Sequence, residues 1–236
     1  MSAQYTFTSL HDEAPSGFYK VNDDSYVILK RQTEKNQFFD NADINKLFEF
    51  MYNLAPIPNP LRPSTYLKRA QATFSPTNYD FGQKTVTFPY DDNVPELIQT
   101  CKKIVEDTLE EYNFNGKYNG THVSMYPDGN AGIDPHEDNE CVIDQSVPIA
   151  SISFGQTRKF SFYRHQTSEE RNKQLEKSKA KIKPAPKPVK IVTTNLHHGD
   201  ILFMVNMQKI GILHGIVKDP KLKKPRLNLT YRKFFI

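Results

Sequence analysis

The chain has 236 residues, of which 37% are hydrophobic and 25% are charged, and its formal net charge is +4. This length suffices for one domain with a buried core, and the composition is that of a soluble globular protein. No apolar run reaches the roughly 20 residues of a membrane span, and the first residues, MSAQYTFTSLHDEAPSGF, lack the apolar core of a secretory signal. We expect an intracellular, soluble monomer that does not bind membranes, with the nucleus as an alternative location if the source is eukaryotic.

Two segments in the first half have the period of amphipathic helices. Residues 42 to 54 place apolar side chains on one face, with Asn41 or Asp43 available as the N-cap. Residues 93 to 112 do the same, with Pro95 in the first turn, where its missing N–H costs nothing. We predict that both helices support the outside of the core. Residues 1–60 are interpreted as a helical and irregular extension packed on a domain of residues 61–236.

After residue 117 the chain consists of short runs that are rich in strand-forming residues. These runs are THVSMY, PIASISF, KFSFYRH, KIVTTNL, DILFMV, GILHGIV and RLNLTYRKF. Several short strands with turn signals between them favour a barrel or sandwich over a parallel sheet with crossover helices. The predicted fold class is α+β, mostly β with flanking helices, around an antiparallel jelly roll (double-stranded β-helix).

A basic segment interrupts these runs between residues 166 and 190. Its part RNKQLEKSKAKIKPAPKPVK, residues 171–190, holds eight basic residues and one acidic residue and ends in a Pro-alternating tract that excludes a helix there. We predict a basic, extended insertion. It either neutralises phosphates of a nucleic acid or forms a solvated loop, and its composition is compatible with both.

Two His-x-Asp pairs are candidates for metal binding. His136 and Asp138 lie in PHEDNE, and His214 in LHGIV could add the third ligand of a two-histidine, one-carboxylate set that holds Fe(II) and leaves positions open. His198 and Asp200 in HHGDILF have the same spacing. We interpret this second pair as a turn that enters an apolar strand, because glycine followed by aspartate suits a turn.

The run RLNLTYR, residues 226–232, alternates polar and apolar side chains. As a strand it places Arg226, Asn228, Thr230 and Arg232 on one face and an apolar stripe on the other. A dicarboxylate cosubstrate needs one end at the metal and the other end held by a planar donor that binds bidentately, which is arginine chemistry. The strand therefore predicts a carboxylate site near the metal.

Five motifs in order, HVSMYPDGNAGIDPHEDNE, PIASISFG, HHGDILFM, LHGIV and RLNLTYR, resemble the signatures of the AlkB family of Fe(II)/2-oxoglutarate dioxygenases, above all the members that repair alkylated nucleic acid. The resemblance covers residues 66–236. It implies that iron is held by His136, Asp138 and His214. It further implies that Arg226 and Tyr126 hold the distal carboxylate of 2-oxoglutarate, while Asn228 and Arg232 lie nearer the metal.

One position departs from the family pattern. The family usually has asparagine two residues before the tyrosine, and this chain has Ser124. Serine offers one donor where the amide offers two, so its contact to the cosubstrate is either lost or mediated by water. We still expect the cosubstrate to bind.

The segment QATFSPTNYDFG resembles the nucleotide-recognition lid of the family, which we place at residues 66–90. Tyr79 and Phe81 match its Tyr-x-Phe pattern. An enzyme that acts on a base in a duplex must flip the base out, and Phe81 and His136 would then stack on its two faces. Alternatively, the two aromatic residues are only packed on a hairpin.

The resemblance implies an oxidative demethylase for N-alkylated bases in DNA, or in RNA, that uses Fe(II), 2-oxoglutarate and O2 and releases succinate, CO2 and formaldehyde. Such chemistry belongs to the cofactor and requires no Ser/His/Asp triad. Two alternatives remain. The first is the same chemistry on a protein side chain. The second is a non-catalytic nucleic-acid-binding module, which the presence of all three ligands and both arginines disfavours.

Overall fold

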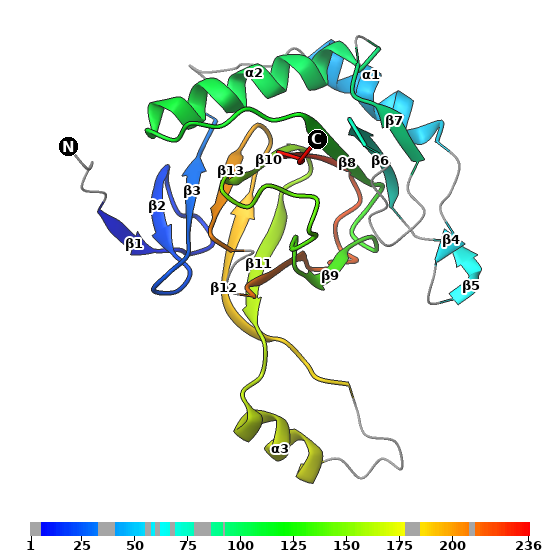
Figure 1. Ribbon diagram of the computed structural model, residues 1–236. Coiled ribbons are helices and arrows are strands. Elements are labelled where there is room, and N and C mark those ends of the chain that lie inside the picture. Colours follow the sequence, from blue (N-terminus) through cyan, green and yellow to red (C-terminus); the bar gives the residue numbers. More distant parts are fainter. Residues whose placement is uncertain are drawn as a thin grey trace.

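Two facing β-sheets with helices on one outer face form the body of the protein (Figure 1). The computed structural model describes residues 6–32, 41–54, 58–59, 62–66, 69–77, 86–91, 93–177, 185–207 and 211–236. The seven runs expected after residue 117 all form strands. The fold-class prediction is confirmed, because the structure is mostly β, with two largely antiparallel sheets and flanking helices.

The larger sheet has nine strands, most of them antiparallel. In spatial order they are β1 (Phe7–Ser9), β2 (Gly17–Lys20), β3 (Tyr26–Lys30), β13 (Ile201–Val205), β10 (Ile149–Gly155), β15 (Arg226–Arg232), β8 (Gly120–Tyr126), β6 (Ala70–Ser75) and β7 (Val86–Pro89). The smaller sheet has the order β12 (Val189–Leu196), β11 (Arg158–Arg164), β14 (Leu213–Ile216) and β9 (Ile133–His136). A separate pair consists of β4 (Pro58–Asn59) and β5 (Arg62–Tyr66).

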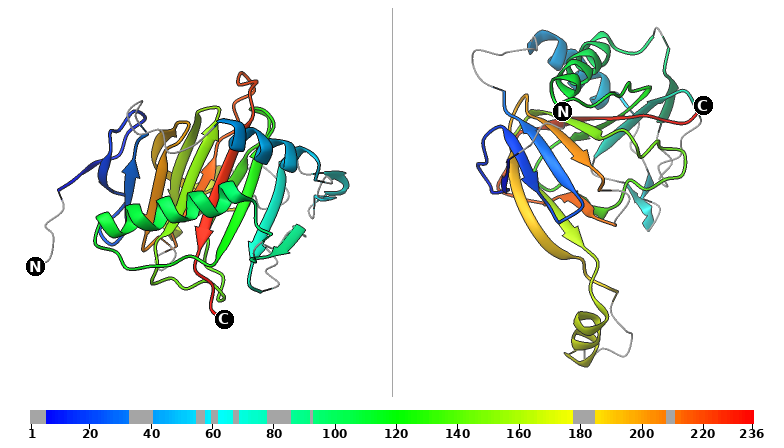
Figure 2. Two further views of the ribbon diagram at one scale, coloured as in Figure 1. Left: turned by 90° about the horizontal axis from the view of Figure 1, so that it is seen from above. Right: turned by 60° about the vertical axis from the view of Figure 1, so that its left-hand side comes forward.

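Two helices cover the outer face of the larger sheet, as predicted (Figure 2). They are α1 (Asn41–Tyr52) and α2 (Glu96–Glu111). The apolar stripe of α2 and the apolar side of β15 belong to one buried cluster, and Tyr231 donates a hydrogen bond to the carbonyl of Ile98 at 2.8 Å. Among the described residues, no helix has the length and apolar character needed to cross a membrane.

The space between the sheets divides into an apolar part and a polar part. Side chains from both sheets fill the apolar part, including Phe160 and Phe162 of the smaller sheet and Leu202 of the larger. Polar residues occupy the inner face of β15 and β8 instead, and they are buried as well. Buried polar groups need partners, so this region is the place to look for a site.

The N-terminal segment differs from the expected helical and irregular extension, because β2 and β3 extend the larger sheet and β3 pairs antiparallel with β13. The run Val27–Leu29 is buried without alternation. Periodicity does not distinguish such a short apolar run from part of a helix, so the strand gave no clear signal. The division of the chain at residue 60 stays a prediction.

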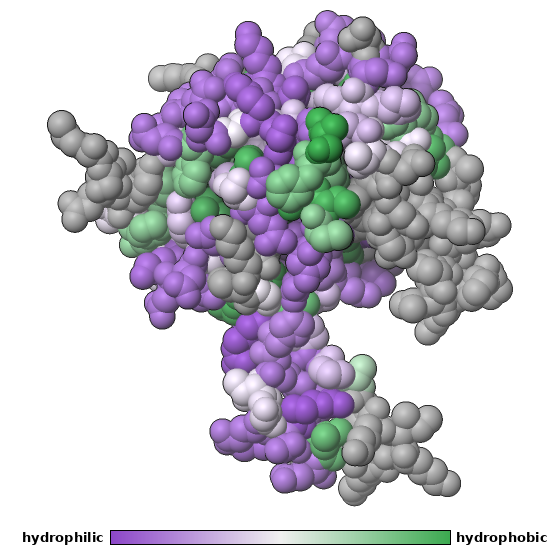
Figure 3. All heavy atoms as spheres, in the orientation of Figure 1, coloured by the Kyte–Doolittle hydropathy of each residue, from purple (hydrophilic) through white to green (hydrophobic). Residues whose placement is uncertain are grey.

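The basic insertion begins with a helix, so the prediction of an extended segment is wrong for α3 (Ser168–Lys177). The helix begins at a capping box: the Thr167 hydroxyl accepts from the Glu170 N–H, and the Glu170 carboxylate accepts from the Thr167 N–H. Figure 1 shows that α3 lies at the end of the β11–β12 hairpin, away from the body. Its visible surface is mostly hydrophilic (Figure 3).

Candidate metal centre

Three potential ligands converge on the smaller sheet. His136 ends β9 and pairs in register with His214 of β14, while Asp138 is the second residue after β9. The two imidazole centroids are 4.5 Å apart. One ligand atom from each of the three residues lies within 4.8 Å of the others, and no second group of this kind occurs in the described ranges. The predicted triad therefore meets in space.

The protonation states of these side chains suit a cation. Burial and the nearby His136 lower the pKa of His214 to about 3, and burial lowers the pKa of His136 as well. Both imidazoles are therefore neutral at pH 7 and have a lone pair to offer. His136 donates through Nδ1 to the carbonyl of Asp134 at 3.0 Å, which leaves Nε2 for the metal.

Asp138 is held as a carboxylate. Burial is the largest single influence and opposes its ionisation, but the charge and hydrogen bond of Arg232, together with the nearby His214 and His136, lower the pKa of Asp138 below its ordinary value. Arg232 donates to Asp138 Oδ2 at 2.8 Å, and Oδ1 is buried with no hydrogen-bond partner among the described residues. Two neutral imidazoles and one ionised carboxylate form a donor set that fits Fe(II).

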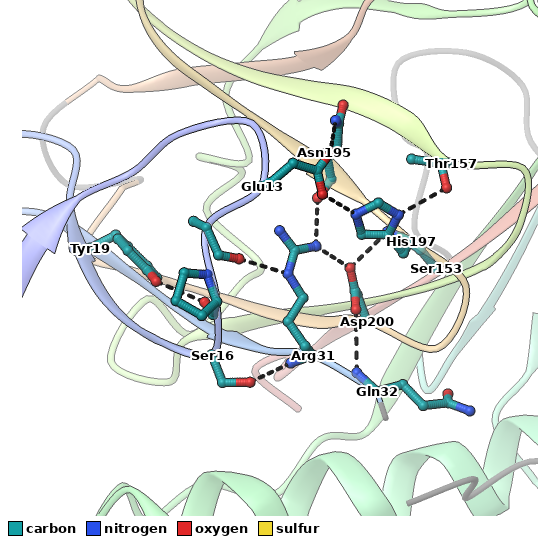
Figure 4. Close-up of polar contacts among 12 residues, drawn as sticks. Glu13, Ser16, Tyr19, Arg31, Gln32, Ser153, Thr157, Asn195, His197 and Asp200 are labelled. Carbon is teal, nitrogen blue, oxygen red and sulfur yellow. Dashed lines mark hydrogen bonds and ion pairs between the residues drawn. The ribbon is translucent and has the colours of Figure 1, made fainter. Parts of the chain in front are cut away.

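The second His-x-Asp pair has a structural role, and Figure 4 shows the contacts of its aspartate, Asp200. Asp200 forms a buried ion pair with Arg31 and accepts a hydrogen bond from the His197 N–H at 2.7 Å. Gly199 has a φ of +80°, which glycine tolerates and which forms the turn into β13. His198 accepts a hydrogen bond from the Gly155 N–H at 3.1 Å. These contacts tie the N-terminal segment to the sheet.

The polar face of β15 lies beside the triad. Opposite it on β8, Tyr126 pairs with Arg226 and Ser124 pairs with Asn228. Arg226 is fully buried and donates through Nη2 to Ser153 at 2.8 Å and to Asn228 at 2.7 Å. Its Nε and Nη1 have no hydrogen-bond partner among the described residues. Such orphaned donors fit a buried carboxylate ligand.

A second buried arginine, which sequence reasoning missed, supports Tyr126. The guanidinium carbons of Arg158 and Arg226 lie 5.8 Å and 5.3 Å from the centroid of the Tyr126 ring. Arg158 also donates to the backbone carbonyls of Ala131 and Val217, each at 2.8 Å. Burial lowers the pKa of Arg226 to about 10, so its guanidinium remains charged at pH 7.

One cavity joins the triad to this polar face. Its room for water-sized molecules is about 40 Å³, within about 440 Å³ of empty space that includes open solvent. Its lining includes His136, Asp138, His214, Ser124, Tyr126, Asn228, Thr230 and Arg232. The structure thus brings these predicted metal and cosubstrate residues together around one cavity. Arg226 is not one of the lining residues, but it pairs with Tyr126 and donates to Asn228, which both line the cavity. Their individual roles toward a cosubstrate remain predictions.

The cavity also contains His122, which the sequence analysis did not single out. The alternation of His122, Ser124 and Tyr126 along one strand face was the available signal. The predicted base-stacking residues Tyr79 and Phe81 lie outside the described residues. The resemblance to a nucleotide-recognition lid therefore stays a prediction.

Comparisons with known proteins agree with this geometry. The 2OG-Fe(II) oxygenase superfamily matches residues 27–232. The chain is 26% identical to the DNA oxidative demethylase ALKBH2 of Bos taurus, over 88% of this chain and 67% of that protein. It is 30% identical to ALKBH2 of Mus musculus, over 70% of this chain and 61% of that protein.

Similarity extends to a second kind of relative and to a solved structure. The alpha-ketoglutarate-dependent dioxygenase alkB homolog 3 of Mus musculus is 28% identical over 59% of this chain and 43% of that protein. The structure of OsALKBH1 superimposes with a TM-score of 0.52 at 16% identity, covering 88% of this chain and 97% of that one. The chain is therefore an AlkB-like member of the 2OG-Fe(II) oxygenase superfamily, an enzyme whose cofactors are Fe(II) and 2-oxoglutarate.

Proposed function

We propose that this enzyme is an oxidative demethylase for N-alkylated bases in DNA or RNA. The observation that carries the proposal is one cavity with an iron triad and orphaned arginine donors behind it, in a chain that is similar over most of its length to proteins named DNA oxidative demethylases. The reaction consumes 2-oxoglutarate and O2 and converts the N-methyl group to a hydroxymethyl group. This group leaves as formaldehyde, with succinate and CO2 as the other products.

The residues of the chain act by binding and orienting. Bound Fe(II) supplies the oxidation of the methyl C–H bond at the expense of 2-oxoglutarate and O2. His136, Asp138 and His214 would hold the iron on one side and leave the other side open. Arg232 keeps Asp138 ionised, so the carboxylate binds without first losing a proton.

The cosubstrate would lie along the polar face of β15. Arg226 would offer its Nε and Nη1 donors to the distal carboxylate, together with the Tyr126 hydroxyl. Asn228 is already oriented, because its Oδ1 accepts from Arg226 and its Nδ2 donates to Thr230 at 2.8 Å. Arg232 donates to the carboxylate of the predicted iron ligand Asp138. Arg226 and Arg232 would therefore act at opposite ends of β15.

The base would enter on the side of His136. Its side chain is 25% exposed, whereas those of Asp138 and His214 are almost fully buried, so His136 is the ligand nearest the opening. We propose that Phe81 and His136 stack on the two faces of a flipped base and that Tyr79 also binds the substrate. The basic β11–β12 hairpin would contact phosphates, and its binding would then weaken with salt.

The test is a matched panel of single- and double-stranded DNA and RNA oligomers that each carry one N-methylated base. Wild-type protein with Fe(II), 2-oxoglutarate and O2 should remove a methyl mass from at least one oligomer and release formaldehyde in equal amount. His214→Ala should abolish both signals. His198→Gln, which changes a histidine outside the triad, should preserve them. Iron-loaded protein that demethylates no oligomer in the panel would contradict the proposal.

A further inference from the structure

A buried histidine lies in the cavity beside the predicted cosubstrate residues. His122, Ser124 and Tyr126 alternate along the inner face of β8, and all three line the cavity. His122 stands between Thr230 of β15 and Thr73 of β6 in the register of the sheet, and it is 5% exposed. None of the steps derived above uses this imidazole.

Both ring nitrogens of His122 have hydroxyl partners. Nδ1 lies 2.8 Å from Thr73 Oγ1, and Nε2 lies 3.2 Å from Ser124 Oγ. Burial and the nearby charges of Arg232 and Arg69 lower the pKa of His122, so the ring carries one proton. It therefore donates to one of these hydroxyls and accepts from the other.

The position of that proton decides what Ser124 can offer to the cavity. With the proton on Nδ1, Ser124 must donate to Nε2, and its only hydroxyl proton is used inside the protein. With the proton on Nε2, Ser124 accepts from His122, and its proton is available to a ligand. A carboxylate only accepts hydrogen bonds, so a carboxylate next to Ser124 selects the second arrangement, with Thr73 donating to Nδ1.

We infer that His122 is a positioning residue for 2-oxoglutarate, because its Nε2–H holds the Ser124 oxygen and directs the Ser124 proton at a carboxylate of the cosubstrate. The three groups then form one directed chain from Thr73 to the ligand, in which each hydrogen bond polarises the next. In this way Ser124, which has a single donor, would still donate a hydrogen bond to the cosubstrate. The inference rests on the cosubstrate pocket of the proposed function.

The first test measures the dissociation constant of 2-oxoglutarate for the Fe(II)-loaded protein by anaerobic calorimetry, where no turnover occurs. His122→Leu should weaken binding about tenfold, as expected for a lost hydrogen bond to a charged group. His122→Gln keeps a donor near the Nε2 position and should bind close to wild type. Ser161→Ala is the matched control, because it removes a partly buried hydroxyl pair with Thr193, and neither residue lines the cavity.

A double-mutant cycle separates positioning from general packing. His122→Leu should add nothing to Ser124→Ala if His122 acts through Ser124, whereas losses that multiply would overturn the inference. Nitrogen NMR of the zinc-loaded protein with 2-oxoglutarate should show the proton on Nε2 of His122, and a proton on Nδ1 would also overturn it. Wild-type protein that fails to bind 2-oxoglutarate would contradict the proposed function itself. Tight wild-type binding that His122→Leu leaves unchanged would contradict this inference alone.

Discussion

Arg226 illustrates how a single side chain is prepared for an anionic ligand. Full burial of a guanidinium is costly, and within the described part of the chain only Nη2 of Arg226 has hydrogen-bond acceptors, Ser153 and Asn228. The remaining donors are arranged before any ligand arrives, because Asn228 and Ser153 fix the group from one side and the Tyr126 ring covers it from another. A carboxylate ligand would restore the missing hydrogen bonds.

Replacement of Arg226 by lysine should therefore weaken 2-oxoglutarate binding although it keeps the charge. Lysine lacks the planar fork, and loss of a charged hydrogen bond predicts a dissociation constant about ten- to a hundredfold higher. Titration of the Fe(II)-loaded variant with 2-oxoglutarate measures this. Ser153→Ala is the matched control, because it removes one acceptor of Arg226 but leaves the fork. Equal affinities of wild type and Arg226→Lys would remove Arg226 from the cosubstrate pocket.

The sequence predicted the residues that bind the metal and the cosubstrate better than the residues that hold those side chains in place. His136 and Asp138 share a short motif, and alternation along β15 identified Arg226 and Arg232. Arg158 lies in no such motif, because its function depends on carbonyls that only the fold brings to it. Partners that are distant in sequence are not visible in one-dimensional patterns.

The turn between β12 and β13 is joined to the residues after β3 by the ion pair between Asp200 and Arg31. Asp200 is 1% exposed, and its carboxylate accepts from Arg31, from the His197 N–H of the turn and from the Gln32 N–H. Removing one partner of a buried ion pair leaves the other charge without compensation. The pair therefore fixes the start of the segment that leads from β3 to α1.

Asp200→Asn should destabilise the protein by about 3 kcal/mol while leaving metal binding per folded molecule unchanged. Urea unfolding measures the first effect and metal titration the second. Lys159→Ala, which removes the exposed pair between Lys159 and Asp12, should cost less than about 1 kcal/mol. If a folded Asp200→Asn protein lost its metal, the His198–Asp200 pair would belong to a metal site and would not be only a structural turn.

Glu170 in the capping box of α3 has an unusually low pKa. Hydrogen bonds from Arg164 and from the Thr167 N–H lower the pKa of Glu170 from 4.5 to about 2. Because the folded value is the lower one, this contribution to the order of α3 is present above pH 4.5 and is lost as the pH falls through about 2. Carboxyl NMR shifts measure the midpoint. Arg164→Gln should move it up toward 4.5, and an ordinary midpoint in the wild type would contradict the box.

Elements were predictable where a periodic pattern was long. Residues 93–112 contain α2, and the polar alternation of residues 226–232 matched β15. The start of α3 was missed although Thr167 and Glu170 have the spacing of a capping box. The lysines and prolines after this start favour an extended chain. The two hydrogen bonds of the capping box nevertheless stabilise the first turn of α3.

For the whole molecule, a bound metal would link the paired strands β9 and β14 to the segment that follows β9. The triad comes from β14, the end of β9 and the second residue after β9, and Arg232 links it to the centre of the larger sheet. A metal that binds only the folded chain stabilises it by about 2.7 kcal/mol at a hundred times its dissociation constant. Binding is therefore linked to the stability of both sheets.

Mn(II), which resists air oxidation, should raise the melting temperature of the wild-type protein by roughly 5 °C or more at that concentration. A thermal melt with increasing Mn(II) measures the shift. His214→Ala should show none, and His198→Gln should match the wild type. An equal shift in His214→Ala would place the stabilising metal elsewhere.

The most direct measurement is an anaerobic titration of the full chain, first with Fe(II) and then with 2-oxoglutarate, followed by visible absorption. A keto acid that chelates ferrous iron produces a charge-transfer band. We predict one equivalent of each ligand and a band that disappears in His214→Ala and requires far more 2-oxoglutarate in Arg226→Lys. No band in the iron-loaded wild type, or a band unaffected by both substitutions, would contradict a single pocket built from the triad and β15.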